Sequence, residues 1–398
     1  MAEILLSPWH LGIDHISSDT NLPMGAVRDA INVDIDRSGT IQSRAGYYRA
    51  LALAGAHSVW TSEARNSYCV SGGVLQSLSF QDGSLSATPL PYTLEADLPL
   101  SYQDLNGEVV CANRSEILRI RADNTVVRLG VEDPSPPALA VSAGVGGLDA
   151  GRYGVAVTFL RGVEESGLSG AAWLDVSAGD GLSVVLPQPS ESDVTGIRIY
   201  RTGANGDVFY RAVDAPTGAS PYVVGAGVLG RQTDTRFMVR MPGGHILRYW
   251  KGRLLCARGK NLLFSEPLRY GIFTPSENFV QFPHRILMVQ PAEGGVFVGT
   301  KSGVTFLRGT TPSEWVAYNT GGEAPVAGTD IRIETSILKE DRDYGGAYAA
   351  LWLAGNGFVV GTHDGNLVQA QAKRIRLPDT SGAGAAVLFN RSIIAAIN

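Results

Sequence analysis

The sequence predicts an all-β protein, a β-propeller with an inserted β-sandwich. The first observation is a repeated hairpin pattern, in which a short apolar strand is followed by a turn and a second strand. Five stretches carry the pattern, and their equivalent positions are Cys69, Cys111, Cys256, Val298 and Val360. Two of the four intervals between these positions are 42 residues, and the others are 145 and 62. A period of about 40–45 residues with several short strands per unit is typical of propeller blades.

The second observation is an apolar residue nine positions before each of these markers, which predicts the strand that precedes the turn. These residues are Trp60, Tyr102, Leu247, Val289 and Leu351. The pattern thus predicts five blades directly. A hairpin expected over residues 31–45 and strands expected over 385–389 and 393–397 predict a sixth, mixed blade that ties the two ends of the chain together.

The third observation is a stretch that breaks the rhythm, since the 145-residue interval exceeds the period by 103 residues. Within it, apolar strands separated by glycine turns are expected at residues 151–160, 181–187, 196–202 and 208–213. Several short strands in a stretch of this length are typical of a fibronectin type III or immunoglobulin-like β-sandwich. The sequence therefore predicts a sandwich inserted between two blades.

Domain boundaries follow from these elements and from a proline-rich joint at residues 133–137. We expect a single helical turn over residues 24–30, opened by Pro23, and a protruding hairpin over residues 331–338. The predicted parts are an N-terminal segment and hairpin joining the propeller (1–46), propeller blades (47–133), the inserted sandwich (138–240), and further blades with the ring closure (243–398).

The composition argues against several classes of function. The chain has 33 Lys and Arg against 38 Asp and Glu, a net charge of −5, and no run of five like charges. A dedicated DNA-binding surface needs a concentrated basic patch, so none is predicted. No stretch of 18 apolar residues occurs, which predicts no membrane-spanning helix. The first nine residues lack the basic and apolar regions of a secretory signal.

Two turn-like patterns resemble ligand or sugar motifs without completing them. Asp34-x-Asp36 resembles the first half of a calcium loop, but Ala45 occupies the twelfth position, where a bidentate Glu is needed. The stretch Thr362-His-Asp-Gly365 is similar to the aspartate box of sialidase propellers, but its Asp–Gly spacing differs and no Trp follows. Both are interpreted as polar hairpin turns.

Two pairs of acidic residues, Glu164-Glu165 and Asp341-Arg-Asp343, lie at expected loop tips. A glycosidase needs two carboxylates across a cleft, so neighbours in sequence carry little weight. The six histidines are scattered, and the three cysteines share one strand position, where small buried residues are expected. We predict no catalytic, cofactor-binding or metal-binding residues, no cofactor and no enzymatic activity.

The most specific motif lies near the N-terminus. It reads Leu22-Pro-x-Gly-Ala-x-Arg-Asp-Ala-x-Asn-Val-Asp-Ile-Asp-x-x-Gly-x-Ile-x-x-Arg44 and is followed by an apolar strand at residues 57–60. This opening resembles that of tail nozzle proteins of short-tailed bacteriophages, which are also called tail stabilisation or tail accessory proteins. The regions 249–254, 263–266 and 196–201 look similar to the same family.

The resemblance implies a structural protein of the virion tail. It implies a homo-oligomeric ring of six copies, located below the portal and its adaptor ring, through which the genome is ejected and to which fibre or needle proteins attach. DNA would pass through this conduit without specific binding, which suits a mildly acidic chain. No stable membrane insertion is expected, and no functional residue transfers individually.

An alternative from another class is a propeller that binds or hydrolyses glycans of the host surface, with the sandwich as its carbohydrate-binding module. That reading predicts spaced carboxylates in a cleft and exposed aromatic residues on one propeller face. A third reading is a minor capsid or baseplate protein of a long-tailed phage. The sequence leaves the neighbouring tail proteins and the host undetermined.

Overall fold

The computed structural model describes residues 9–35, 38–44, 46, 48–62, 67–338, 346–369, 371–378, 380–389 and 392–397. In this part of the chain the regular structure consists of β-strands and three short 3₁₀ helices, η1 (Asp19–Asn21), η2 (Pro312–Glu314) and η3 (Thr335–Ile337). None of the described helices is long and apolar enough to cross a membrane. The protein is therefore all-β, as predicted.

Five antiparallel sheets of four strands form a β-propeller, and each sheet is one blade. Blades 1 and 2 precede the two-sheet insertion. Blade 1 contains β5 (His57–Thr61), β6 (Ser67–Ser71), β7 (Val74–Gln81) and β8 (Ser84–Thr93), and blade 2 contains β9 (Ser101–Leu105), β10 (Glu108–Ala112), β11 (Ile117–Ile120) and β12 (Val126–Arg128).

Blades 3, 4 and 5 follow the insertion. Blade 3 contains β22 (Ile246–Trp250), β23 (Arg253–Arg258), β24 (Asn261–Phe264) and β26 (Phe279–Gln281). Blade 4 contains β27 (Ile286–Ala292), β28 (Gly295–Thr300), β29 (Gly303–Arg308) and β30 (Val316–Asn319), and blade 5 contains β31 (Ile331–Glu334), β32 (Tyr348–Ala354), β33 (Gly357–Gly361) and β34 (Leu367–Val368).

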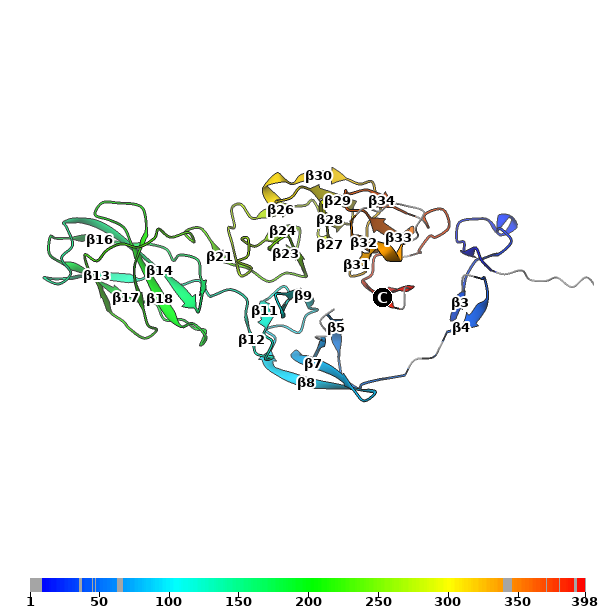
Figure 1. Ribbon diagram of the computed structural model, residues 1–398, viewed down its shortest axis with the longest axis horizontal. Helices are drawn as coiled ribbons and strands as arrows, with labels where there is room; N and C mark the ends of the chain where they lie inside the picture. The colour runs from blue at the N-terminus through cyan, green and yellow to red at the C-terminus, as the bar shows by residue number, and fades with distance from the viewer. Residues whose placement is uncertain are drawn as a thin grey trace, which may run out of the picture.

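The blades follow one another around a common centre, with the first strands β9, β22 and β27 side by side (Figure 1). Hydrophobic cores lie between successive blades, so blades 2, 3 and 4 are buried on both faces. Strand β10 shows how the sequence encodes this. Val110 packs toward blade 3 while its neighbour Cys111 packs toward blade 1, because successive side chains of a strand point to opposite faces. A continuous apolar run results.

The three cysteines lie on equivalent strands, the second of blades 1, 2 and 3. The nine-residue spacing also has a structural cause, because it joins residues that face each other across a hairpin. Tyr102 pairs with Cys111 and Leu247 with Cys256. In blade 1 an irregular register between His57 and Trp60 shifts the pairing, so that Trp60 faces Tyr68.

The fifth copy of the pattern is displaced by one strand. Leu351 and Val360 face each other across β32 and β33, the second and third strands of blade 5. The residues that lengthen the last interval supply β31, which pairs with β32 and becomes the first strand of the sheet. The protruding hairpin expected at residues 331–338 is therefore wrong, because this segment is a blade strand followed by η3.

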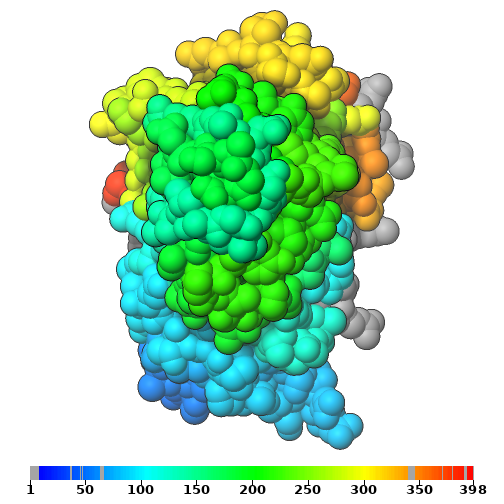
Figure 2. Space-filling view, turned by 90° about the vertical axis from the view of Figure 1, so that its left-hand side faces the viewer, coloured from blue at the N-terminus to red at the C-terminus, as the bar shows by residue number. Residues whose placement is uncertain are grey.

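Between blades 2 and 3 the chain forms two further antiparallel sheets, here called the two-sheet unit. One sheet contains β13 (Ala138–Ser142), β17 (Gly181–Val185) and β20 (Tyr222–Val224); the other contains β14 (Gly151–Arg161), β15 (Glu164–Glu165), β16 (Ala172–Val176), β18 (Gly196–Arg201) and β19 (Tyr210–Ala215). They share a core that includes Val157, Leu182 and Ile199. The unit projects from one side of the propeller (Figures 1 and 2). Its fibronectin- or immunoglobulin-like topology stays a prediction.

The N-terminal arm, residues 9–44, contains β1 (Gly12–Ile13), β2 (Ala26–Val27), β3 (Val33–Ile35) and β4 (Ile41–Ser43). The helical turn expected over residues 24–30 is wrong, because Ala26 and Val27 pair in parallel with Gly12 and Ile13. The C-terminal hairpin contains β35 (Gly384–Phe389) and β36 (Ser392–Ile397).

The arm and the C-terminal hairpin do not form the expected mixed sixth blade within this chain. β3 pairs with β4 and β35 with β36, as two separate two-stranded sheets. The arm is held elsewhere by hydrogen bonds to the loop after blade 5. The His15 amide donates to the Arg374 carbonyl at 2.7 Å, and Arg374 Nη1 donates to the Leu11 carbonyl at 2.9 Å. These contacts hold the arm against the loop after blade 5, so its hairpin does not pair with the C-terminal hairpin.

Candidate functional site

The sequence-adjacent carboxylates Glu164 and Glu165 are each engaged by arginine and do not act as a pair. Glu164 lies 2.6 Å from Arg119 Nη1, on the propeller side of β15. Glu165 lies 2.7 Å from Arg198 Nη1 and accepts hydrogen bonds from the Tyr200 hydroxyl and Thr158, both at 2.7 Å. Because the two side chains bind different partners, they offer no acid–base pair to a substrate.

The two turn-like patterns, at Asp34-x-Asp36 and at Thr362–Gly365, each bind residues of their own turn or hairpin. The Thr362 hydroxyl donates to the Asp364 carboxylate, and this bond holds the pKa of Asp364 below its ordinary value. Asp34 forms an ion pair with Arg44 at 2.8 Å. Asp36 and Ala45, like Asp341 and Asp343, lie outside the described residues. Among the residues that are described, no group of three or more His, Cys, Asp and Glu could hold a metal ion.

The three thiols are buried in the blades rather than exposed to a ligand. Cys69, Cys111 and Cys256 are all free cysteines with at most 1% exposure. Burial raises the pKa of Cys69 and Cys111, and raises that of Cys256 to about 12. A thiol with a raised pKa is protonated at neutral pH and is a poor nucleophile.

This burial leads to a testable expectation for thiol chemistry. In the native protein all three cysteines should react with iodoacetamide at least about a hundredfold more slowly than a free thiol, because the thiolate is the reactive species. In denaturant all three should react at the ordinary rate. Mass spectrometry of samples quenched over time measures the rates, and fast modification of any cysteine in the folded protein would contradict the expectation.

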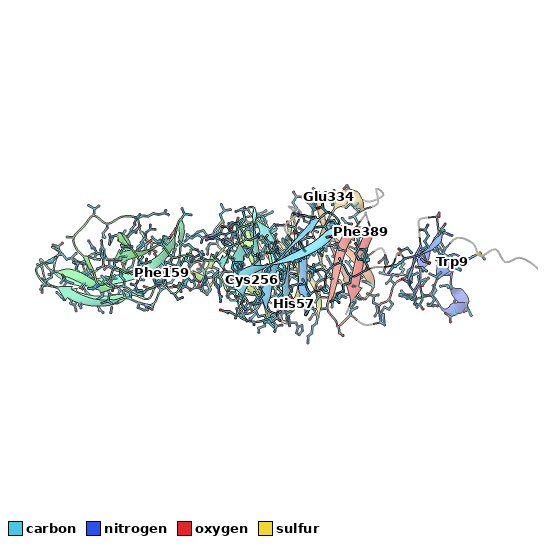
Figure 3. All side chains as sticks on the ribbon, turned by 90° about the horizontal axis from the view of Figure 1, so that it is seen from below. Trp9, His57, Phe159, Cys256, Glu334 and Phe389 are labelled. Atoms are coloured by element: carbon cyan, nitrogen blue, oxygen red, sulfur yellow. The ribbon has the colours of Figure 1, made fainter. Side chains whose placement is uncertain are left out.

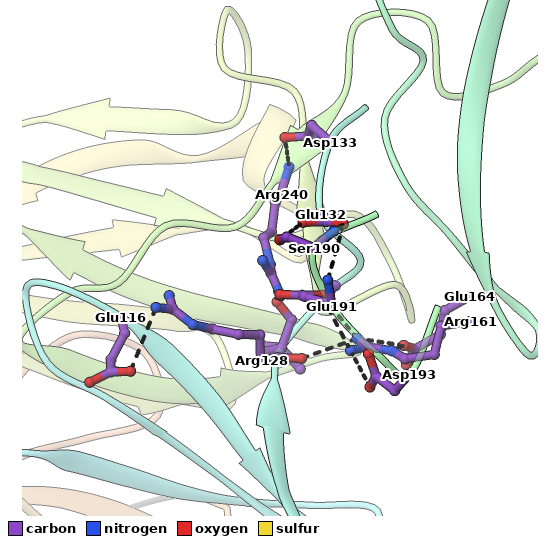
Figure 4. A network of polar contacts seen from close by, with 12 residues as sticks. Glu116, Arg128, Glu132, Asp133, Arg161, Glu164, Ser190, Glu191, Asp193 and Arg240 are labelled. Atoms are coloured by element: carbon purple, nitrogen blue, oxygen red, sulfur yellow. Dashed lines mark hydrogen bonds and ion pairs between the residues drawn. The ribbon is translucent and has the colours of Figure 1, made fainter. Parts of the chain in front are cut away.

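A network of charged side chains lies where the two-sheet unit meets the propeller, and we call it the ionic joint (Figure 4). Its centre is Arg161, at the end of β14, whose side chain is only 5% exposed. The guanidinium lies 3.0 Å from Glu164, 3.0 Å from Asp193 and 4.0 Å from Glu191. A buried arginine needs such partners, because an unpaired buried charge is strongly destabilising.

Arg161 also binds the propeller backbone directly. Its Nη2 donates to the carbonyl oxygens of Arg128 at 3.1 Å and Gly130 at 2.8 Å, just after β12 of blade 2. Only glycine fits at position 130, because its φ is +73° and an added Cβ would lie 2.2 Å from the carbonyl oxygen of Gly271. The Arg161 side chain of the two-sheet unit therefore binds the backbone at the end of blade 2.

A second arginine completes the ionic joint from the returning chain. Arg240, in β21 (Val239–Arg240), donates to the carbonyls of Leu129 at 3.0 Å and Gly130 at 2.8 Å, and pairs with Glu191 at 2.7 Å. Its backbone amide donates to Asp133 at 3.0 Å. Burial raises the pKa of Asp133. Arg161 and Arg240 thus bind the same Gly130 carbonyl and the same Glu191 carboxylate where the unit meets the propeller.

A buried carboxylate lies at the propeller end of this network. Glu116, which is 1% exposed, accepts hydrogen bonds from the Tyr92 hydroxyl and the Glu95 amide, both at 2.7 Å, and lies 3.8 Å from Arg128. Burial raises the pKa of Glu116. Burial and the bond to Glu116 raise the pKa of Tyr92 to about 12. Glu116 and Asp133 are the two described carboxyl groups whose pKa is raised.

The raised pKa of Glu116 predicts a pH dependence of stability. A carboxyl with a higher pKa in the folded state binds its proton more tightly there, so its contribution is present at acid pH and is lost as the pH rises through the folded pKa. We therefore compare the free energy of unfolding of the wild type with that of Glu116→Gln. The difference between them should fall as the pH is raised from 4.5, the ordinary pKa of a glutamate, towards neutrality. Urea denaturation at several pH values measures this, and a constant difference would contradict it.

Sequence reasoning did not find the ionic joint. Its partners are far apart along the chain, with Arg161 and Asp193 32 residues apart and Arg240 and Gly130 110 residues apart. The proline-rich segment at 133–137 marked the place in the chain, but nothing in it indicated which arginines would converge there. In the described network Glu164, Asp193 and Glu191 are each paired with an arginine.

The comparisons with known proteins identify no family for this chain. The chain matches no known family, and no curated protein matches it. Among solved structures it is similar to BBS1N in complex with ARL6DN, with 12% identity, a TM-score of 0.32 and coverage of 87% of this chain and 92% of that chain.

Two further solved structures show a comparable likeness. YCF48 from Cyanidioschyzon merolae has 12% identity and a TM-score of 0.30, with coverage of 85% and 92%. Apo AztD from Citrobacter koseri has 12% identity and a TM-score of 0.26, with coverage of 80% and 87%. At these identities and TM-scores the similarity carries no information about what this chain does.

Proposed function

We propose that this chain is a structural subunit of a bacteriophage tail, a nozzle protein that assembles as a homohexameric ring around the path of the ejected genome. In this role it belongs to the virion, contacts the portal-adaptor ring and fibre or needle proteins, lets DNA pass without specific binding, and catalyses no reaction. The observation that carries the proposal is the motif at residues 22–44, which resembles the opening of the nozzle family.

The contacts of the motif residues support a structural rather than a chemical role. Arg28 donates to the carbonyl oxygens of Asp14, at 3.1 Å, and Ser17, and forms an ion pair with Asp19 at 2.7 Å. Arg44 closes the β3–β4 hairpin through Asp34. Because these polar side chains bind partners within the arm, the described part of the motif supports a role in assembly.

The rigid connection between the propeller and the two-sheet unit also supports the proposal. A conduit must keep its shape while DNA moves through it, and Arg161 and Arg240 hold both chain connections of the unit to the same point of blade 2. The net charge of −5 on the chain is compatible with a passage that does not retain phosphate groups.

Cryo-electron microscopy of the virions that contain this chain tests the proposal. We expect density for the propeller in a closed ring on the tail axis, with one heterologous interface repeated around it. Density in the capsid shell or at a fibre tip would exclude the nozzle function. Native mass spectrometry of the purified protein gives an independent measure of the number of copies in the ring.

A further inference from the structure

The C-terminal hairpin occupies the position of a sixth blade but supplies only half of one. It lies between β31 and β5 around the propeller (Figure 1), and β35 lies against β31, the first strand of blade 5. Neighbouring first strands lie side by side in the same way, as β22 does with β9 and β27. By this placement β35 and β36 are the first and second strands of the blade, and no further strand of the described residues extends their sheet.

The two-stranded sheet leaves one open edge and one apolar face. Among the described residues, β36 pairs only with β35, so its other edge presents unpaired backbone groups. One face of the hairpin carries Val387, Phe389 and Ile394, which are 54%, 60% and 52% exposed. The opposite face is covered, since Ile393 packs against the core of blade 5. An open strand edge beside an exposed apolar face favours pairing with another strand.

The N-terminal arm has the matching properties. Its hairpin, β3 and β4, contains the two strands that would complete a four-stranded blade. The arm exposes Met24 by 87%, Ile31 by 86% and Ile41 by 43%, a large apolar surface for a short segment. Of these, Ile41 lies in β4, so a joined blade would bury it together with the apolar face of the C-terminal hairpin.

The arm of the same chain is held away from this edge. The Trp9 amide donates to the Gly39 carbonyl at 2.9 Å and ties the hairpin to the start of the arm, which is anchored in turn on Arg374. The His15 ring adds a contact to the Arg376 carbonyl at 3.1 Å. In two perpendicular views the arm projects outward from the propeller and is separated from the C-terminal hairpin (Figures 1 and 3), and Trp9 and Phe389 are labelled well apart in Figure 3.

We infer that the sixth blade is completed between copies: hairpin β3–β4 of one copy adds to the edge of β36 in the next. Each copy then offers one arm and one half-blade, and such a head-to-tail interface closes into a ring when its rotation permits. Adding strands to an open edge supplies main-chain hydrogen bonds, and the apolar side chains supply the burial. The inference rests on the ring proposed above and identifies the segments that join its subunits.

Complementation between two full-length variants tests whether the arm hairpin of one copy adds to β36 of the next, which we call the exchange. Ile394→Lys places a charge on the half-blade and leaves the arm intact, whereas Ile41→Lys changes the arm and leaves the half-blade intact. Each alone should lose the ring, with the concentration for half-assembly raised at least about tenfold. An equimolar mixture should form dimers, because the intact arm of the first docks on the intact half-blade of the second. Val228→Lys, at a 96% exposed apolar residue of the two-sheet unit, is the control and should keep the ring.

Native mass spectrometry and backbone hydrogen exchange give the readouts. In the wild type, the amides of residues 392–397 should exchange at least about tenfold more slowly in the ring than in dissociated subunits, because they gain partners. If the wild type forms a ring and both variants keep it, the exchange is excluded, whereas the proposed ring is supported. If the mixture gives no dimer, the exchange between copies is excluded. A wild type that stays monomeric would remove the ring proposal and this inference with it.

Discussion

Arg161→Ala should separate the two-sheet unit from the propeller and lower the free energy of unfolding by about 3 kcal/mol. The substitution leaves Glu164, Asp193 and the carbonyl oxygen of Gly130 without their shared cation. The expected value is at the low end of the range for a broken buried ion pair, because Glu164 and Asp193 retain 34% and 28% of their side-chain exposure and so keep contact with water.

Differential scanning calorimetry should show this loss as a split transition, since the unit and the propeller no longer unfold together. Small-angle scattering should show a wider distribution of shapes for the same variant. The matched control is Arg231→Ala, which removes an ion pair to Asp234 at 3.9 Å whose arginine side chain is 85% exposed. That change should cost less than about 0.5 kcal/mol. Equal effects of the two variants would show that the ionic joint does not connect the two parts.

The propeller could be predicted from the sequence because its blades repeat one local rule. A second strand buried on both faces requires consecutive apolar residues, as in Val109, Val110 and Cys111, and its hairpin partner lies nine residues earlier. These patterns are local, so they survive in a single sequence. The fifth copy lies one strand later than the other copies, because the same hairpin pattern fits strands one and two or strands two and three of a sheet.

The ionic joint and the open edge of β36 could not be predicted in the same way. Arginine and glutamate occur throughout the chain, and only the folded backbone brings Arg161, Arg240 and Glu191 to one place. The sequence predicts a hairpin over residues 31–45 and strands over residues 385–389 and 393–397. Their separation depends on hydrogen bonds from the arm to Arg374 and Arg376, which have no local signature.

The largest single loss of stability should come from Trp352→Ala, between blades 4 and 5. Trp352 is fully buried, and its ring lies 5.4 Å from that of Phe297 in a core shared with Phe306. Removing a buried aromatic side chain leaves a cavity that the neighbouring sheets cannot fill, and costs about 3–5 kcal/mol. Adjacent blades are held together by such cores, so the loss should spread to blade 4.

Trp352→Phe separates the effect of volume from that of the indole N–H. The Nε1 atom of Trp352 is buried and has no hydrogen-bond partner among the described residues, so replacing the indole removes an unsatisfied donor as well as some volume. We expect Phe to cost less than about 1.5 kcal/mol, because it keeps an aromatic ring against Phe297. Phe80→Ala, at a 71% exposed residue of blade 1, should cost less than about 0.5 kcal/mol and serves as the control. Far-ultraviolet circular dichroism during denaturation measures all three, and an alanine variant at position 352 as stable as the Phe80 control would show that this core does not hold the blades together.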